Sequence, residues 1–192
     1  MKIILTSKSN IKESALQLWA KEILKKKIFI EKLEINNKFL PEQPINSGIE
    51  IICEKRITFI ENEYSNIIKS SNYIVSIENG IEIKENKIID KVCVIIKNIV
   101  TGKTKTFSGS PITIEYKNLN GYSKIKNIID DFIFNYKITN NKYDYDGSSI
   151  TFGNLINKYY PQIPANNWMK VLCNKDRIYQ IFDVLKIICN LD

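Results

Sequence analysis

The chain of 192 residues contains no histidine. Without histidine it cannot form Ser-His or Cys-His nucleophilic pairs or the common histidine-zinc sites. Any catalysis must therefore use carboxylates, lysines or hydroxyls, with or without a hard metal ion that prefers oxygen ligands.

Closely spaced cysteines and long apolar runs are also missing. The four cysteines lie far apart and show no C-x-x-C spacing, at Cys53, Cys93, Cys173 and Cys189. No segment approaches the roughly 18 apolar residues of a membrane helix, and the apolar start at residues 3–5 is too short for a secretory signal. We therefore expect a soluble, reduced, cytoplasmic protein that has neither a membrane anchor nor a structural zinc.

What is present suits a globular fold. Hydrophobic residues make up 44% of the sequence and aromatic residues 10%, and a chain of this length can bury a sizeable core, so we predict one domain over 1–192. The formal charge of +7 favours an anion such as phosphate. Because the lysines are spread along the chain, with no basic stripe between aromatics, a specific nucleic-acid partner is not expected.

Hydrophobic periodicity predicts an α/β fold with a mixed, partly antiparallel sheet flanked by helices. Strands are predicted over 2–6, 28–35, 91–100 and about 103–107, with another that ends at Glu78 and a hairpin near 85–86. Helices are predicted from Ser9 or Asn10 to about 24, over 49–68, over 123–136 with Phe134 on the apolar face, and from 167 onward. Residues 36–47 read as a proline-bearing loop, residues 108–111 as a break, and residues 151–160 are ambiguous. Trp168, Met169 and Leu172 have helical spacing and are expected in the core, with a partner surface as the alternative.

Glu78 follows a short, β-branched apolar run, Y-I-V-S-I, that is typical of a buried strand. A carboxylate there is costly unless a cation meets it, so Glu78 is a candidate for binding Mg²⁺ or for acting as a general base. Gly80 would let a ligand approach the backbone. A purely structural ion pair and an exposed strand end remain open as alternatives.

The first strand-to-helix turn, T-S-K-S-N-I-K over residues 6–12, combines hydroxyls and lysines with free N–H groups at a helix start. These are the parts of a phosphate cradle. The turn lacks the glycines of a P-loop, and Asn10 followed by Glu13 resembles a capping box, so simple helix capping remains the alternative.

A family resemblance joins these two features. Residues 76–82, S-I-E-N-G-I-E, are similar to the A-I-E-A-G-I-D segment of the inosine/xanthosine triphosphatase family, which hydrolyses aberrant purine nucleoside triphosphates. In the same order, residues 7–12 resemble its S/T-x-N-P-x-K turn, residues 41–44 its P-x-Q-P loop and residues 151–155 its T-x-G-x-L motif, and Arg56 falls near its N-R helix motif. The resemblance covers roughly residues 2–155 and leaves 160–192 as a divergent helical segment.

The resemblance implies an elongated mixed sheet with a central cleft between two lobes, usually in a homodimer. The implied activity is Mg²⁺-dependent cleavage of inosine or xanthosine triphosphate into the diphosphate and phosphate. Glu78 and Lys12 would be the catalytic groups, with Glu78 holding the metal or a water. The implied substrate-binding residues are Thr6, Ser7, Lys8, Ser9, Asn10, Lys12 and Gly80.

Two positions depart from the family's acidic metal ligands. These positions hold Asn37 and Ser70, and an asparagine oxygen can bind Mg²⁺ only without the charge of a carboxylate. Glu34 or Glu42 could compensate. The alternative function is therefore a catalytically inactive relative that binds a nucleotide or a protein partner.

Overall fold

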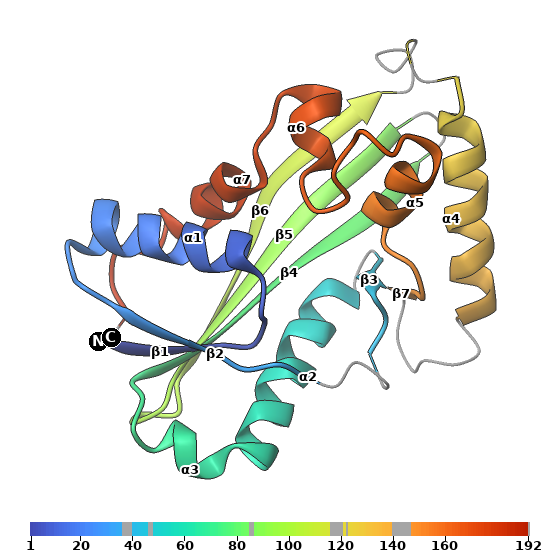
Figure 1. Cartoon of the computed structure of the whole chain (residues 1–192). Coiled ribbons are helices and arrows are strands. Elements are labelled where there is room, and N and C mark those ends of the chain that lie inside the picture. The colour runs from blue at the N-terminus through green and yellow to red at the C-terminus, as the bar shows by residue number, and fades with distance from the viewer. Residues whose placement is uncertain are drawn as a thin grey trace.

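The computed structural model describes residues 1–35, 40–45, 48–84, 87–115, 121, 123–139 and 147–191. Within these ranges a five-stranded sheet has the order β2-β1-β4-β5-β6 (Figure 1). The elements β1 (Lys2–Leu5), β2 (Phe29–Lys32) and β4 (Tyr73–Lys84) pair in parallel, with β1 in the middle. The strands β4, β5 (Lys87–Asn98) and β6 (Thr104–Glu115) are antiparallel. The predicted mixed, partly antiparallel sheet flanked by helices is confirmed.

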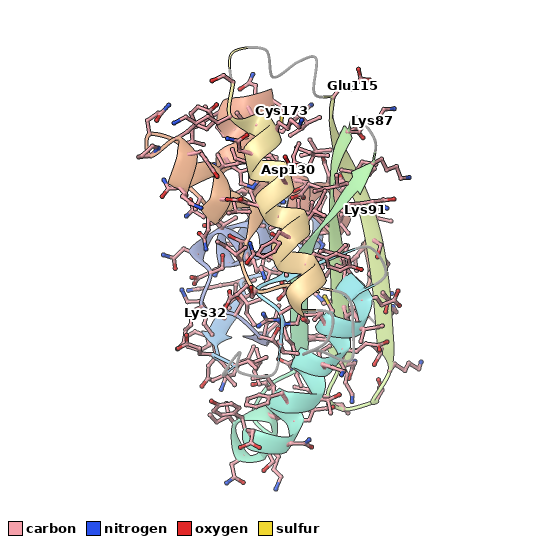
Figure 2. All side chains as sticks on the ribbon, turned by 90° about the vertical axis from the view of Figure 1, so that its right-hand side faces the viewer. Lys32, Lys87, Lys91, Glu115, Asp130 and Cys173 are labelled. Carbon is pink, nitrogen blue, oxygen red and sulfur yellow. The ribbon has the colours of Figure 1, made fainter. Side chains whose placement is uncertain are left out.

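The three antiparallel strands are longer than the sequence predicts. β4 does not end at Glu78 but continues to Lys84, because Ile81 and Ile83 maintain the apolar alternation and find packing partners beyond Gly80. The predicted break at residues 108–111 lies inside β6, where Ser110 has a φ of 46° and the register shifts against β5. The turn-forming residues there produce a bulge instead of a strand end. Figure 2 shows the far ends of β5 and β6 at the labelled, paired residues Lys87 and Glu115.

Helices cover both faces of the sheet around β1 (Figure 1). One face packs against α1 (Asn10–Trp19), its π-helical continuation η1 (Ala20–Leu24) and α7 (Arg177–Leu185), through a core that includes Leu16, Trp19 and Val75. The other face packs against α2 (Gly48–Glu63) and α3 (Ser65–Ile68). Because both faces are covered, the centre of β4 is buried on both sides. We call this part the first lobe.

A second lobe surrounds the far ends of β4, β5 and β6. It consists of α4 (Ile125–Thr139), α5 (Phe152–Tyr159) and α6 (Trp168–Cys173), and α4 stands in front of the strands in Figure 2. Trp168 and Met169 are buried in its core, which confirms the first of the two expectations for them. Phe134 is exposed, so its predicted place on the apolar face of α4 is wrong; that face follows Ile125, Ile128, Ile129 and Phe132 at helical spacing.

Two short strands, β3 (Gln43–Pro44) and β7 (Gly147–Ser148), pair antiparallel between the lobes. β3 lies within the predicted proline loop, and Ile45, next to it, forms an isolated parallel bridge with Ile81 of β4. Residues 85–86 of the predicted hairpin lie outside the described residues, although the strands on either side pair antiparallel as predicted. Among the described helices, none is both long and apolar enough to cross a membrane.

Candidate functional site

A pocket of about 300 Å³ lies beside the middle of β4, between the two lobes. β1 ends at Leu5, opposite Val75, whereas β4 runs on for nine more residues. Beyond Val75, no strand among the described residues pairs with this edge of β4 until the Ile45–Ile81 bridge, and the side chain of Gln43 donates to the carbonyl of Asn79 on the way. An opening at the carboxyl ends of parallel strands is a common place for a ligand in α/β proteins. Residues of both lobes line the pocket: Ser9, Ile11, Lys12, Glu42, Gln43, Glu78, Asn79, Thr151, Gly153, Asn154, Ala165, Asn166, Trp168, Arg177 and Ile181.

Glu78 meets two cations at this opening. Its Oε1 lies 3.2 Å from Nζ of Lys12 and 2.5 Å from Nε of Arg56, and only 8% of its side chain is exposed. Burial raises the pKa of the Glu78 carboxyl, but the charges of Arg56 and Lys12 outweigh burial and leave this pKa below its ordinary value. Glu78 is therefore ionised at neutral pH. The prediction that a cation must meet this carboxylate is confirmed.

Lys12 projects from the first turn of α1 and is itself mostly buried. Burial lowers the pKa of its ammonium group more than the charge of Glu78 raises it, and the charge of Arg56 lowers it further. Two cations share one carboxylate here, so the group carries one excess positive charge. An anion that reaches this group is attracted by its net positive charge, whereas Glu42, which also lines the pocket, would repel it.

Ser9 also lines the pocket, and it caps the helix. Its Oγ accepts a hydrogen bond from N of Lys12 (3.4 Å), so the cap is Ser9, and the predicted capping box at Asn10 is wrong by one residue. The side chain of Asn10 accepts a hydrogen bond from Nζ of Lys32 (2.8 Å) and does not line the pocket. Ser7 accepts a hydrogen bond from N of Ser9 (3.2 Å) and stiffens the turn.

Two other residues of this turn lie away from the pocket. Thr6 is fully buried, so its side chain cannot touch a ligand, contrary to its predicted role. Its carbonyl instead accepts a hydrogen bond from Nη1 of Arg56 (3.5 Å) and so helps to hold that cation. Lys8 is exposed and does not belong to the pocket lining. The structure therefore brings Ser9, Lys12 and Glu78 together and leaves Thr6, Ser7, Lys8 and Asn10 outside the pocket lining.

Gly80 serves packing and not ligand access. A Cβ at this position would lie 2.1 Å from Cγ1 of Ile49 and 3.2 Å from the carbonyl of Pro44. The glycine therefore lets α2 approach β4 closely, and the predicted substrate contact is wrong.

The two predicted uncharged metal ligands do not join Glu78. Ser70 lies before the start of β4 and accepts a hydrogen bond from Nζ of Lys2 (3.1 Å). Glu78 is five residues beyond the first residue of β4, roughly 16 Å along a strand, so Ser70 cannot share a metal ion with it. Asn37 lies outside the described residues.

Several pocket residues were missed by sequence reasoning, or were noticed only through the T-x-G-x-L motif. Thr151 caps α5 by accepting a hydrogen bond from N of Asn154 (3.0 Å). A Cβ on Gly153 would lie 1.9 Å from the carbonyl oxygen of Ala165, so only glycine lets that segment pack on the first turn of α5. Arg177 is the first residue of α7. Residues at the N-terminal ends of α1, α5 and α7 thus line one pocket, but the end of α7 is already met by the carboxylate of Asp176, whose Oδ1 accepts a hydrogen bond from N of Ile178 (2.9 Å).

Arg177 forms a second buried ion pair, with Asp90 of β5. Gln180 and Asn79 bind the same carboxylate: Nε2 of Gln180 donates to Oδ1 of Asp90 (2.9 Å), and so does Nδ2 of Asn79 (3.3 Å). Nε2 of Gln43 donates to the carbonyl of Asn79 (2.6 Å), which connects β3 to this network. No local sequence pattern indicates this pair, because its partners are 87 residues apart.

The described donors fit an anion better than a resident Mg²⁺. No group of three or more Cys, Asp or Glu side chains comes together within the described ranges. Oε1 of Glu78 already contacts two cations, and their excess positive charge opposes a further cation. Glu42 lines the pocket, whereas Glu34 is exposed and does not.

The comparisons with known proteins identify the fold only. No family model and no curated protein matches the sequence. Among solved structures, the crystal structure of protein VC0702 from Vibrio cholerae superposes with a TM-score of 0.60 at 12% sequence identity. The match covers 96% of this chain and 90% of that chain. The two proteins share an overall fold, and a shared fold does not by itself imply a shared function.

Proposed function

We propose that the chain is a nucleoside triphosphate phosphohydrolase whose pocket holds the phosphates at its Lys12 end. The observation that carries this proposal is the position of Lys12, in the first turn of α1, beside the ionised Glu78 in the pocket. Phosphate groups bind well at helix N-termini, where backbone N–H groups and the dipole both favour an anion. Cleavage of a phosphoanhydride would release the diphosphate and phosphate.

Lys12 supplies charge neutralisation in this mechanism. Its ammonium group lines the pocket, and it shares Glu78 with Arg56, so a phosphate oxygen can recruit it without leaving Glu78 unpaired. Negative charge increases on the leaving diphosphate as the anhydride bond breaks. A cation held in place before the reaction stabilises that charge.

Glu78 acts chiefly on water and on Lys12. Its lowered pKa makes it a weak base, but phosphoryl transfer through a loose transition state demands little proton abstraction before bond cleavage. An ionised carboxylate can still accept a hydrogen bond from the attacking water and orient it. Because Glu78 fixes Nζ of Lys12 at 3.2 Å, the same residue also positions the cation.

The part of the pocket lining around Arg177 suits the uncharged part of a nucleotide. Arg177 is neutralised by Asp90, and the neighbouring lining residues Asn79, Asn154 and Asn166 are polar but uncharged. A wall of this kind offers hydrogen bonds to a sugar or a base and has no excess charge for a phosphate. The choice of inosine or xanthosine triphosphate and the homodimer rest on the sequence resemblance, and the cytoplasmic location rests on the widely spaced cysteines; all three are part of this proposal.

Phosphate release from a panel of inosine, xanthosine, adenosine and guanosine triphosphates with Mg²⁺ tests the proposal. Lys12→Met should lower kcat/KM by about 100-fold or more, which is the usual loss when one charge-stabilising donor is removed. The matched control is Lys8→Met in the same turn, which should retain wild-type activity because Lys8 is exposed outside the pocket. Equal losses in both variants would contradict the phosphate site. Wild-type hydrolysis of inosine triphosphate no faster than that of Glu78→Gln would overturn the reaction.

A nucleotide-binding protein without turnover is the second candidate. It is favoured by the engagement of Glu78 Oε1 with two cations and by the position of Ser70 away from the site. Calorimetry with inosine triphosphate separates the two functions. Tight binding that is independent of Mg²⁺ and yields no phosphate supports this second candidate, and no nucleotide binding at all would indicate a protein-interaction role.

A further inference from the structure

The ion pair of Asp90 and Arg177 is enclosed more completely than the other charged group of the pocket. Asp90 is 1% exposed, and its Oδ1 accepts hydrogen bonds from Arg177, Gln180 and Asn79. Gln180 is also buried, and its Nε2 donates to the carbonyl of Ser110 on β6 (3.2 Å). The network therefore anchors the first turn of α7 to β4, β5 and β6.

These contacts occupy one side of the Arg177 guanidinium. Nη1 donates both to Oδ1 of Asp90 and to Oε1 of Gln180 (2.8 Å). A guanidinium has five N–H hydrogens, and Nη1 carries two of them. The described residues offer no partner to the hydrogens on Nη2 and Nε, and Arg177 is part of the pocket lining. The guanidinium is thus held through Nη1, and its Nη2 and Nε can bind a ligand.

We propose that Asp90 and Gln180 are positioning residues, which orient Arg177 so that its remaining N–H groups bind the uncharged part of the substrate. This inference rests on the proposed function. Asp90 cancels the charge of Arg177 and leaves its hydrogen-bonding geometry intact. The network therefore turns a cation into a directional donor for a neutral acceptor, such as a carbonyl or hydroxyl oxygen.

The network anchors α7, but a gain in stability is a weak reason for the ion pair at its centre. A buried ion pair is weak evidence for stability, because apolar residues of similar volume commonly stabilise a core as well or better. Oδ2 of Asp90 is buried and has no partner among the described residues, which adds to the cost of the pair. An orientation that serves the adjacent pocket explains why one carboxylate oxygen takes all three donors.

Two probes test the two ends of the pocket separately. Inosine has a base but no phosphate, and inorganic tripolyphosphate has phosphates but no base. Isothermal titration of the full chain should show Asp90→Asn binding inosine roughly tenfold more weakly, the loss expected for one charge-assisted hydrogen bond. Its tripolyphosphate affinity should not fall by more than about twofold, because the variant removes no cation from the pocket and frees the charge of Arg177. Gln180→Met, which removes the same support and buries no charge, should shift inosine binding in the same direction.

A double-variant cycle then tests whether Asp90 acts through Arg177. Arg177→Lys keeps the positive charge but loses the planar guanidinium with its several N–H donors. The double variant Asp90→Asn/Arg177→Lys should therefore bind inosine no more weakly than Arg177→Lys alone. Additive losses would overturn the positioning role, and so would unchanged inosine affinity in folded Asp90→Asn and Gln180→Met. If wild type binds no tripolyphosphate, the phosphate site of the proposed function fails, whatever inosine does.

Discussion

The two ends of the pocket each contain a buried pair of an arginine and a carboxylate, but their charge balance differs. At one end, Glu78 serves both Arg56 and Lys12, and one positive charge is left over. At the other, Asp90 meets Arg177 alone, and the amides of Gln180 and Asn79 complete its contacts. The same kind of ion pair can therefore attract an anion or orient a neutral donor, depending on how many cations share the carboxylate.

The two pairs also lie on opposite faces of the sheet. Glu78 and Asn79 are neighbours on β4, and successive side chains of a strand point to opposite faces. Glu78 meets Arg56 from α2, whereas Asn79 meets Gln180 from α7. Both residues nevertheless line one pocket, because the pocket surrounds the open edge of β4. A strand edge that no neighbouring strand covers lets residues of both faces contact one ligand.

The largest expected effect comes from removing the cation of the enclosed pair. Arg177→Met leaves Asp90 buried without a counter-charge, which should lower the free energy of unfolding by about 3–5 kcal/mol. Urea unfolding of the full chain measures this loss. Tyr179→Ala on the same helix is the control, because Tyr179 is exposed and should change stability by about 0.5 kcal/mol at most. A loss for Arg177→Met as small as that of the control would show that the pair is not enclosed.

Glu78→Gln should cost slightly less, about 3 kcal/mol, because it leaves Lys12 and Arg56 unpaired at a site that opens to the pocket. The double variant Glu78→Gln/Arg56→Met removes one of these cations and should recover part of the loss. Denaturant unfolding of both variants measures the recovery. A double variant less stable than Glu78→Gln would contradict charge imbalance as the cause.

The stabilisation by Glu78 should disappear in acid. Its pKa is lower in the folded protein than the ordinary carboxyl value, so its contribution is complete above that ordinary value of about 4.3 and is lost as the pH falls through the folded pKa. Unfolding of wild type and Glu78→Gln between neutral and strongly acid pH should therefore give converging stabilities. Curves that stay parallel to the acid limit would show that Glu78 is not ionised in the fold.

Lys12→Met should have the smallest effect on stability, because Glu78 keeps Arg56 as its partner and Lys12 loses the cost of its own burial. We expect a change in the free energy of unfolding of about 1 kcal/mol or less, together with a marked loss of tripolyphosphate binding. Thermal unfolding and titration on one sample provide both values. A large loss of stability with unchanged tripolyphosphate binding would contradict this assignment, because Lys12 would then stabilise the fold and not bind phosphate.

A pH series sharpens the role of Lys12 further. Burial lowers the pKa of its ammonium group, so tripolyphosphate affinity should begin to fall at a lower alkaline pH than an ordinary lysine would give. Lys12→Arg keeps its charge throughout this range and should remove the decline. If both proteins lose affinity in parallel, the titrating group is not Lys12.

The sequence predicted the parts of this molecule that depend on local patterns. The helices and strands follow hydrophobic spacing, and the pairing of Lys12 with Glu78 agrees with a turn and a strand that meet at the carboxyl ends of parallel strands. The Asp90–Arg177 pair could not be predicted in this way, because nothing near either residue specifies a partner on another element. Gly80 was misread for a related reason: the close approach that it permits is that of Ile49, and only tertiary packing reveals this neighbour.

The short length of β1 has a consequence for how this chain tolerates change. Surface turns usually accept inserted residues, but the turn after Leu5 also determines where the pairing along β4 stops. Two more residues in β1 would hydrogen-bond to the open edge of β4 and occupy the space beside Glu78. Substitutions of Ser7 or Lys8 should therefore be tolerated better than any lengthening of this turn. The length of the turn, and not only the identity of its residues, keeps the pocket accessible.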